Sequence, residues 1–161
     1  MYSYTELRKE HPEFIYRGYE IEESADKVGI VYDFEIPGLA SFHPTWEFPK
    51  KRGEQRCFKE NGTFQKLVFS LGMVELISYW KTACPPVVKV EAGSLTEEQC
   101  EWWKDLYFNG LGEFYYTNGI QENQEDFMEI RSLGGDVEGA EQPLSREAEG
   151  FLIPVGGGKD S

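Results

Sequence analysis

The residues with the clearest potential for chemistry stand at the end of the sequence, where an apolar run meets three glycines. Five consecutive apolar residues, Phe151–Val155, are typical of a buried parallel strand. Glycines let the backbone that follows turn sharply and approach a ligand closely, and successive N–H groups can then hold an anion. The candidate phosphate-binding residues are Gly156, Gly157, Gly158, Lys159, Asp160 and Ser161.

Two of these residues indicate how the anion would be held. The hydroxyl of Ser161 can donate a hydrogen bond to a phosphate oxygen. Asp160 is a poor neighbour for a phosphate unless a divalent cation lies between them, so we expect Mg²⁺ at Asp160. A helix normally follows such a loop and adds the partial charge of its N-terminus. The sequence therefore predicts a phosphate ligand that binds together with Mg²⁺.

The spacing of the loop excludes two familiar nucleotide motifs. A Walker A loop has four residues between its glycines and ends in Gly-Lys-Ser or Gly-Lys-Thr. Neither that pattern nor Gly-x-Gly-x-x-Gly occurs here. The plain alternative is a flexible glycine-rich tail, but the apolar strand directly before the glycines favours a phosphate-binding loop.

The loop resembles the pyrophosphate-binding loop of the ATP pyrophosphatase family, whose pattern is Ser-Gly-Gly-x-Asp-Ser after the first strand of an α/β domain. Residues 157–161 match that pattern, with Lys159 in its free position. Gly156 departs from it, because the family usually has Ser there, and one hydroxyl donor is lost. The resemblance implies that the phosphate ligand is ATP.

The position of the loop in the chain indicates which members of the family this sequence resembles. Glutamine-dependent members of that family begin with a catalytic Cys, whereas residue 2 here is Tyr2. Members that thiolate tRNA carry the loop near the N-terminus and often have paired cysteines, whereas here residues 1–150 precede it and no Cys-x-x-Cys pair exists. Residues 14–161 are similar to the UDP-N-acetylmuramoyl-L-alanyl-L-glutamate epimerases of peptidoglycan synthesis. The similarity lies in the final loop, in residues 67–82 and in the Trp102–Trp103 segment.

That resemblance implies an ATP-dependent inversion of the terminal L-glutamate of UDP-MurNAc-L-Ala-L-Glu to D-glutamate, through adenylation of the carboxylate. In that scheme the amides of Gly157 and Gly158 and the hydroxyl of Ser161 hold the ATP phosphates, and Asp160 acts through Mg²⁺. The base that removes the proton has no candidate in the sequence. Because the full-length enzymes are much longer, we expect this chain to be an N-terminal fragment that is inactive alone.

Two other functions stay open beside the epimerase. One is a different ATP pyrophosphatase-type enzyme that adenylates another carboxylate or amide. The other is a non-catalytic interaction domain that ends in a coincidental glycine tail. Substrate specificity separates the epimerase from the first, and a downstream α/β continuation separates both enzymes from the second.

Charge and composition exclude several classes of protein. Lys and Arg number 16 against 29 Asp and Glu, a net charge of −13, which argues against binding nucleic acid or an anionic membrane. The start of the chain has no apolar signal-peptide core, and no apolar run approaches the ~20 residues of a membrane span. Three cysteines without a Cys-x-x-Cys pair indicate three inert, buried or half-buried reduced thiols and a cytoplasmic location.

The segments before the loop predict the elements that must position it. Residues 14–21 and 27–36 alternate apolar and polar positions and predict an antiparallel pair of strands. Residues 41–48 predict a third strand, which Pro44 confines to an edge or breaks. Residues 63–82 predict a central buried helix with apolar residues on most sides. Gly72 in that helix is expected to permit close packing of another backbone.

Two shorter elements follow the central helix. Residues 87–91 predict a strand, and a second helix is expected to begin at Ser94 or Thr96 and to end near Gly110. On that helix, Trp102 and Trp103 point to different sides, so we expect one in the core and one at a domain interface, with stacking on uridine as the alternative. His11 is expected to be a solvated residue of the leader.

Together these elements predict an α+β fold. Over residues 1–133, N-terminal strands pack on a buried central helix. Residues 134–150 are expected to be a linker or mobile loop, because they are rich in glycine and glutamate. Residues 151–161 are expected to be the first strand and phosphate loop of a truncated α/β domain, Rossmann-like and of the PP-loop type. The sequence makes no prediction about the oligomeric state.

Overall fold

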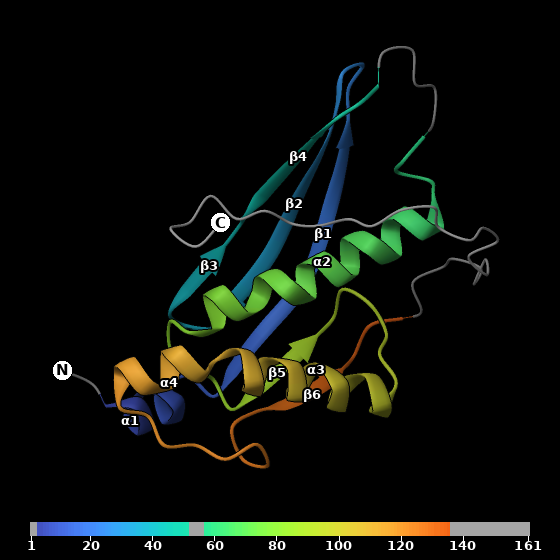
Figure 1. Cartoon of the computed structure of the whole chain (residues 1–161). Helices are drawn as coiled ribbons and strands as arrows, with labels where there is room; N and C mark the ends of the chain where they lie inside the picture. Colours follow the sequence, from blue (N-terminus) through green and yellow to red (C-terminus); the bar gives the residue numbers. More distant parts are fainter. Residues whose placement is uncertain (1–2, 52–56, 136–161) are drawn as a thin grey trace, which may run out of the picture.

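The computed structural model describes residues 3–51 and 57–135, and its framework is a six-stranded mixed sheet with helices beside it (Figure 1). The strands are β1 (Glu13–Glu23), β2 (Lys27–Ile36), β3 (Ala40–Phe42), β4 (Thr45–Pro49), β5 (Val87–Val90) and β6 (Glu129–Ser132). The helices are α1 (Tyr4–Glu10), α2 (Gly62–Trp80), α3 (Glu97–Gly110) and α4 (Gly112–Asn118). The predicted α+β class is confirmed for this part of the chain.

The antiparallel half of the sheet follows the sequence pattern. Strands β1 and β2 pair antiparallel, with Ile21 opposite Ile30, and alternate residues of β2 are buried from Val28 to Ile36. Pro44 breaks the third predicted strand, as one of the two expectations had it. The chain therefore meets the same edge of β2 twice, as β3 opposite residues 34–36 and as β4 opposite residues 27–31.

The other half of the sheet is parallel. Strand β5 pairs with β1, and β6 pairs with β5, both in parallel register. The segment between β5 and β6 carries α3 and α4, so these elements form a strand–helix–strand crossover. Sequence analysis predicted β5 but not β6, whose sequence Glu-Ile-Arg-Ser has a single apolar residue.

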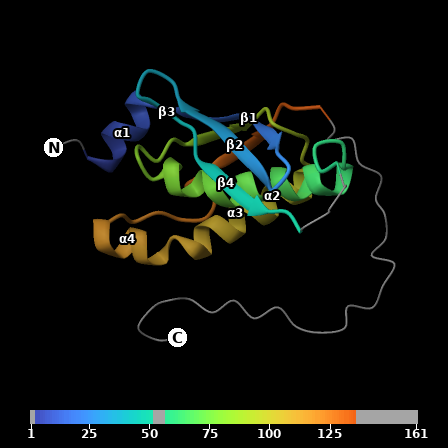
Figure 2. The same cartoon turned by 90° about the horizontal axis from the view of Figure 1, so that it is seen from above.

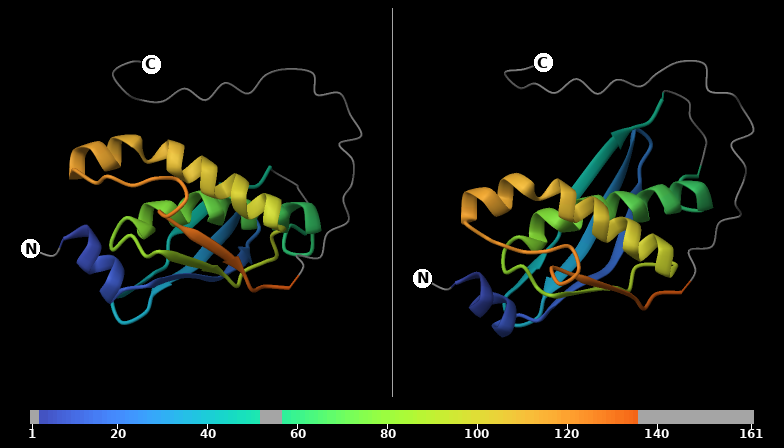
Figure 3. Two further views of the ribbon diagram at one scale, coloured as in Figure 1. Left: turned by 90° about the horizontal axis from the view of Figure 1, so that it is seen from below. Right: turned by 60° about the horizontal axis from the view of Figure 1, so that its bottom comes forward.

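Helices α2, α3 and α4 lie on one side of the sheet, whereas α1 lies at its end, just before β1 (Figures 2 and 3). Figures 2 and 3 show α2 directly against the strands, with α3 and α4 beside it, and no described element on the opposite face of the sheet. Helix α3 begins with a capping box in which Thr96 is the N-cap and Gln99 its reciprocal partner. Of the two predicted N-caps, Thr96 is thus the correct one. No described helix is long and apolar enough to cross a membrane.

The small helix α1, which sequence analysis missed, is fixed by a capping box and by one arginine. Ser3 caps its first turn together with Glu6, and Arg8 donates a hydrogen bond of 2.8 Å to the carbonyl of Cys84. His11 ends the helix and is buried. The prediction that it is solvated is therefore wrong, because α1 packs against the chain that leaves α2.

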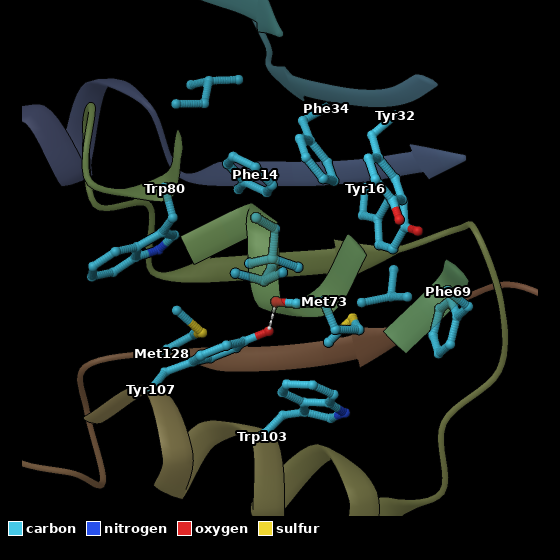
Figure 4. Packing of buried hydrophobic residues seen from close by; sticks show 14 of the residues in the cluster. Phe14, Tyr16, Tyr32, Phe34, Phe69, Met73, Trp80, Trp103, Tyr107 and Met128 are labelled. Carbon is cyan, nitrogen blue, oxygen red and sulfur yellow. Dashed lines mark hydrogen bonds between the residues drawn. The ribbon is translucent and has the colours of Figure 1, made fainter. Parts of the chain in front are cut away.

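The core between α2 and the sheet is strongly aromatic (Figure 4). Gly72 of α2 lies against the side chains of Tyr16 and Tyr32. A Cβ atom at position 72 would lie 2.5 Å from Cζ of Tyr16 and 2.8 Å from Cε1 of Tyr32, and closer still to the Tyr16 hydroxyl. Gly72 does lie at a close approach, but the nearest atoms belong to the side chains of Tyr16 and Tyr32 and not, as the sequence analysis predicted, to another backbone.

Two buried tyrosines of this core differ in their hydrogen bonding. The Tyr107 hydroxyl on α3 donates a hydrogen bond of 2.6 Å to the carbonyl of Met73 on α2 (Figure 4). The Tyr16 hydroxyl is buried without a hydrogen-bond partner among the described residues. A buried polar group without a hydrogen-bond partner lowers the stability of the folded state, whereas a buried group that forms its hydrogen bond raises it.

Tyr107→Phe is therefore expected to lower the free energy of unfolding by about 1 kcal/mol, because it removes the bond that joins α3 to α2. Tyr16→Phe is the matched control, and it should leave that free energy unchanged or raise it. Urea unfolding of the 161-residue chain, followed by circular dichroism, measures both. Equal losses for the two variants would contradict the hydrogen-bonding difference.

Candidate functional site

The predicted phosphate-binding residues lie outside the residues that the structure describes. This holds for Gly156–Ser161, including the predicted Mg²⁺ ligand Asp160, for the preceding strand Phe151–Val155, and for residues 136–150.

The uncovered face of the sheet is polar and is cross-linked by ion pairs. Arg17 on β1 donates hydrogen bonds of 2.9 and 2.6 Å to Glu35 on β2, and one of 3.0 Å to Glu91, which follows β5. These hydrogen bonds raise the pKa of the Arg17 guanidinium. On the same sheet, Lys89 pairs with Glu13 at 2.6 Å. The charges of this face therefore bind one another across three strands.

A shallow hollow of about 430 Å³ lies on this face above Gly18. Arg17 and His43 line it together with Asp33, and Nδ1 of His43 lies 3.6 Å from Oδ1 of Asp33. Because the Arg17 guanidinium already bonds two carboxylates, the hollow offers no free arginine to a phosphate. Its geometry fits a structural charge network better than an anion site.

The carboxyl groups of the domain give no sign of acid catalysis. Among the described residues, every Asp or Glu whose pKa departs clearly from the usual range has a lowered pKa. Hydrogen bonds at helix caps and ion pairs produce such shifts. The residues with a lowered pKa are Glu6, Glu23, Asp26 and Glu129. A general acid at neutral pH needs the opposite shift. Within the described ranges, no group of three or more His, Cys, Asp or Glu side chains could hold a metal.

Glu23 at the end of β1 is the most strongly bonded of these carboxylates. It accepts hydrogen bonds from the N–H groups of Phe58 (3.1 Å) and Lys59 (2.9 Å), and it pairs with Lys50 at 2.8 Å. These contacts, led by Lys50, lower the pKa of Glu23 to about 2. The Cys57 thiol also donates to it, at 3.4 Å. The carboxylate thus ties the segment before α2 to the sheet.

This shift predicts a defined pH dependence. A depressed folded-state pKa means that Glu23 contributes stability above its unfolded pKa of about 4.3, and that the contribution is lost as the pH falls toward about 2. Glu23→Gln should therefore melt below the parent chain at pH 7, and the gap should close near pH 2. Thermal unfolding at both pH values measures the gap, and a gap that does not change with pH contradicts the assignment.

The three thiols differ from one another in exposure. Cys84 is buried and Cys100 half-buried, as expected, but Cys57 is exposed. Burial raises the pKa of Cys84 to about 12, so this thiol is not reactive at neutral pH. The expectation of three buried or half-buried thiols is therefore wrong for Cys57, which lies on the segment that leads into α2.

An apolar groove between α2 and α3 is the most distinctive surface feature. It has a volume of about 240 Å³. Its lining residues are Val74, Ile77, Lys81, Trp103, Leu106, Tyr107, Gly110 and Leu111. Trp103 is buried at its floor, whereas Trp102 is exposed beside it. The prediction that one of the two tryptophans lies in the core is confirmed for Trp103. A domain interface or a uridine contact at the exposed Trp102 stays a prediction.

The groove was not predicted, although a signal for it was present in the sequence. The helix over residues 63–82 has apolar residues on most sides, which predicts a central buried helix. The structure buries only the side that faces the sheet and the neighbouring helix, and Leu67 and Val74 point outward. The excess apolar residues of α2 thus form a surface.

Comparison with known proteins gives a family. Residues 5–161 match the MurL N-terminal domain. The chain belongs to this family. It is also 32% identical, over 97 residues, to the UDP-N-acetyl-alpha-D-muramoyl-L-alanyl-L-glutamate epimerase of Xanthomonas oryzae pv. oryzae (strain MAFF 311018). That match covers 60% of this chain but only 21% of the relative, so the matched part of this MurL domain spans about a fifth of the relative's length.

A comparison with solved structures adds nothing to this. T. thermophilus RuvC in complex with a Holliday junction substrate aligns over 76% of this chain and 64% of its own, with 10% identity and a TM-score of 0.17. So low a score does not indicate a common fold. The MurL match therefore carries the functional argument by itself.

Proposed function

We propose that the chain is the N-terminal domain of an ATP-dependent epimerase that converts the terminal L-glutamate of UDP-MurNAc-L-Ala-L-Glu to D-glutamate. The observation that carries this proposal is the MurL N-terminal domain match over residues 5–161. The epimerase named in the 32% identical relative supports the same reaction. A role in making peptidoglycan precursors in the cytoplasm follows from that reaction as part of the proposal.

The proposal includes a division of the chain. Residues 1–133 form the N-terminal α+β domain, and residues 134–150 link it to the next domain. Residues 151–161 begin that next domain, an ATP-binding domain of the PP-loop type, with a buried strand and a glycine loop. Most of the catalytic domain would then lie beyond the 21% of the relative that this chain matches.

Adenylation solves the chemical difficulty of this epimerisation. The C–H next to a carboxylate is very weakly acidic, because its removal builds a second negative charge beside the first. Attack of the glutamate carboxylate on the α-phosphate of ATP releases pyrophosphate and forms an acyl adenylate, which removes the carboxylate charge. A base can then take the α-proton, and reprotonation on the opposite face inverts the centre. Water cleaves the adenylate to AMP and the D-glutamyl product.

The glycine loop supplies the donors that such a step needs. Backbone N–H groups at Gly156–Gly158 and the Ser161 hydroxyl suit the phosphate oxygens of ATP. Lys159 adds a positive charge near them, and Asp160 suits Mg²⁺ bound to the phosphates. We assign the base to the catalytic domain, where ATP and the substrate carboxylate would meet.

Nucleotide products test this proposal against its alternatives. The full-length protein is incubated with ATP, Mg²⁺ and a panel of carboxylic acids, and AMP and ADP are separated by chromatography. We expect AMP and pyrophosphate only when UDP-MurNAc-L-Ala-L-Glu is present. AMP with another acid alone would indicate a different adenylating enzyme. No AMP with any acid, from folded full-length protein, would favour the non-catalytic interaction domain.

A further inference from the structure

We propose that the outer surface of α2 and α3 is the docking face for the catalytic domain of the same polypeptide. This inference rests on the proposed function, because it names the partner of the N-terminal domain in the epimerase. The docking face consists of Leu67, Val74, Ile77, Trp102 and Leu106 together with the groove between the two helices.

The exposure of these side chains is the first reason. Leu67, Val74, Trp102 and Leu106 are 64%, 52%, 57% and 44% exposed, respectively. Large exposed apolar surfaces on a soluble domain usually mark a contact with another protein surface. Helix α2 has only two charged residues in 19, Lys66 and Glu75. A helix that is apolar on all sides is normally buried on all sides, yet here one side is open.

The shape of the surface is the second reason. The groove between Val74 and Ile77 on α2 and Leu106 on α3 is about 240 Å³, enough for a large apolar side chain. Its floor includes Tyr107, which the hydrogen bond to Met73 holds in place. The site is therefore formed before any partner binds, which lowers the cost of binding.

The length of the relative and the charge of the surface indicate which partner covers the docking face. Because this chain matches only 21% of the relative, most of such a protein is available to cover the face. A second copy is disfavoured, since each chain carries a net charge of −13 and the exposed Glu98 and Asp105 lie one helical turn from Trp102. Residues 136–161 are disfavoured too, with six acidic and two basic residues. The partner surface should be apolar, with Lys or Arg opposite Glu98 and Asp105 and an acidic residue opposite Lys81, which lines the groove.

Hydroxyl-radical footprinting with mass spectrometry tests the docking face directly. The 161-residue chain and the full-length protein are oxidised under the same conditions. In the full-length protein, Trp102 should become buried, and a fall from 57% exposed to about 10% would slow its oxidation about fivefold. His43, on the opposite face of the sheet, and Trp46, on β4, should be oxidised at the same rate in both proteins.

A pair of matched variants makes the test specific. Leu106→Asp in the full-length protein should restore the oxidation of Trp102 to the rate of the 161-residue chain. Leu39→Asp is the control, because Leu39 is 43% exposed in the turn before β3 and Leu106 is 44% exposed. The control should keep Trp102 protected. Protection that survives Leu106→Asp would overturn the assignment.

Two further outcomes would also overturn it. Equal oxidation of Trp102 in both proteins would show that nothing covers the face. Protection that appears in the 161-residue chain and rises with its concentration would assign the face to a second copy. Footprinting needs no turnover, so a protected Trp102 in a protein that forms no AMP would keep the docking face and reject the epimerase. AMP formation in a protein whose Trp102 is not protected would keep the epimerase and reject the docking face.

Discussion

Replacing Asp160 with Asn in the full-length protein is expected to lower kcat/KM for AMP formation at least about 100-fold. In the proposed phosphate loop, Asp160 directly follows residues 156–159, where its carboxylate would reach the metal on the ATP phosphates. Asn keeps the size of the side chain and removes its charge. Loss of the charge weakens the hold on Mg²⁺ just where negative charge builds up as pyrophosphate leaves.

The matched control is Asp136→Asn, the same change at the start of the segment predicted to be a linker. It should leave the rate of AMP formation unchanged. Raising the Mg²⁺ concentration should recover part of the activity of the Asp160→Asn protein. It would recover no activity if the variant were misfolded. Full activity of Asp160→Asn at low Mg²⁺ would reject Asp160 as the metal ligand.

Replacing Gly72 with Ala is expected to destabilise the domain by about 2 kcal/mol, although Ala is the better helix former by about 1 kcal/mol. The added methyl group would meet Cζ of Tyr16 at 2.5 Å and Cε1 of Tyr32 at 2.8 Å. Both rings are fully buried and packed against other aromatic side chains. The overlap must therefore move α2 away from the sheet, and the packing loss outweighs the gain in helix propensity.

Gly112→Ala supplies the control for this substitution. Gly112 opens α4, and a Cβ atom there would meet nothing within 4 Å. The change should leave the free energy of unfolding unchanged or raise it by a few tenths of a kcal/mol. Urea unfolding of both variants measures the difference. A Gly72→Ala chain as stable as Gly112→Ala would contradict the packing of α2 on the tyrosines.

Elements with strong local signals could be predicted from the sequence. Alternation over residues 27–36 predicted β2 with the same bounds that the structure has, because one face of that strand is buried along its length. Thr96 and Gln99 marked the start of α3 through side chains that bond each other's backbone. In both places the information lies within a few consecutive residues.

Elements whose formation depends on distant partners could not be predicted. Strand β6 exists because β5 offers it a parallel edge, and its own residues 129–132 carry almost no pattern. Helix α1 did carry a local signal, the capping box of Ser3 and Glu6, but its place in the fold depends on the contact of Arg8 with Cys84, which is 76 residues away in the sequence. The extent of burial of α2 likewise depends on what surrounds it, and its apolar residues alone do not specify that.

The candidate functional features likewise differ in how far the sequence predicts them. The glycine loop over residues 156–161 is a local motif, so it could be predicted from a few consecutive residues, and the Asp160→Asn variant tests it. The groove between α2 and α3 is a product of packing between helices whose nearest ends are separated by residues 81–96. Only the unusual apolarity of α2 pointed to it in advance.

The most direct test of the proposed epimerase follows the configuration of the glutamate itself. Full-length protein is incubated in D₂O with UDP-MurNAc-L-Ala-L-Glu and Mg²⁺, with and without ATP, and the product is hydrolysed and separated by chiral chromatography. We expect D-glutamate that carries one deuterium at the α-carbon, only when ATP is present. Glutamate that stays L and free of deuterium, while the folded protein is present with ATP, would contradict the assignment.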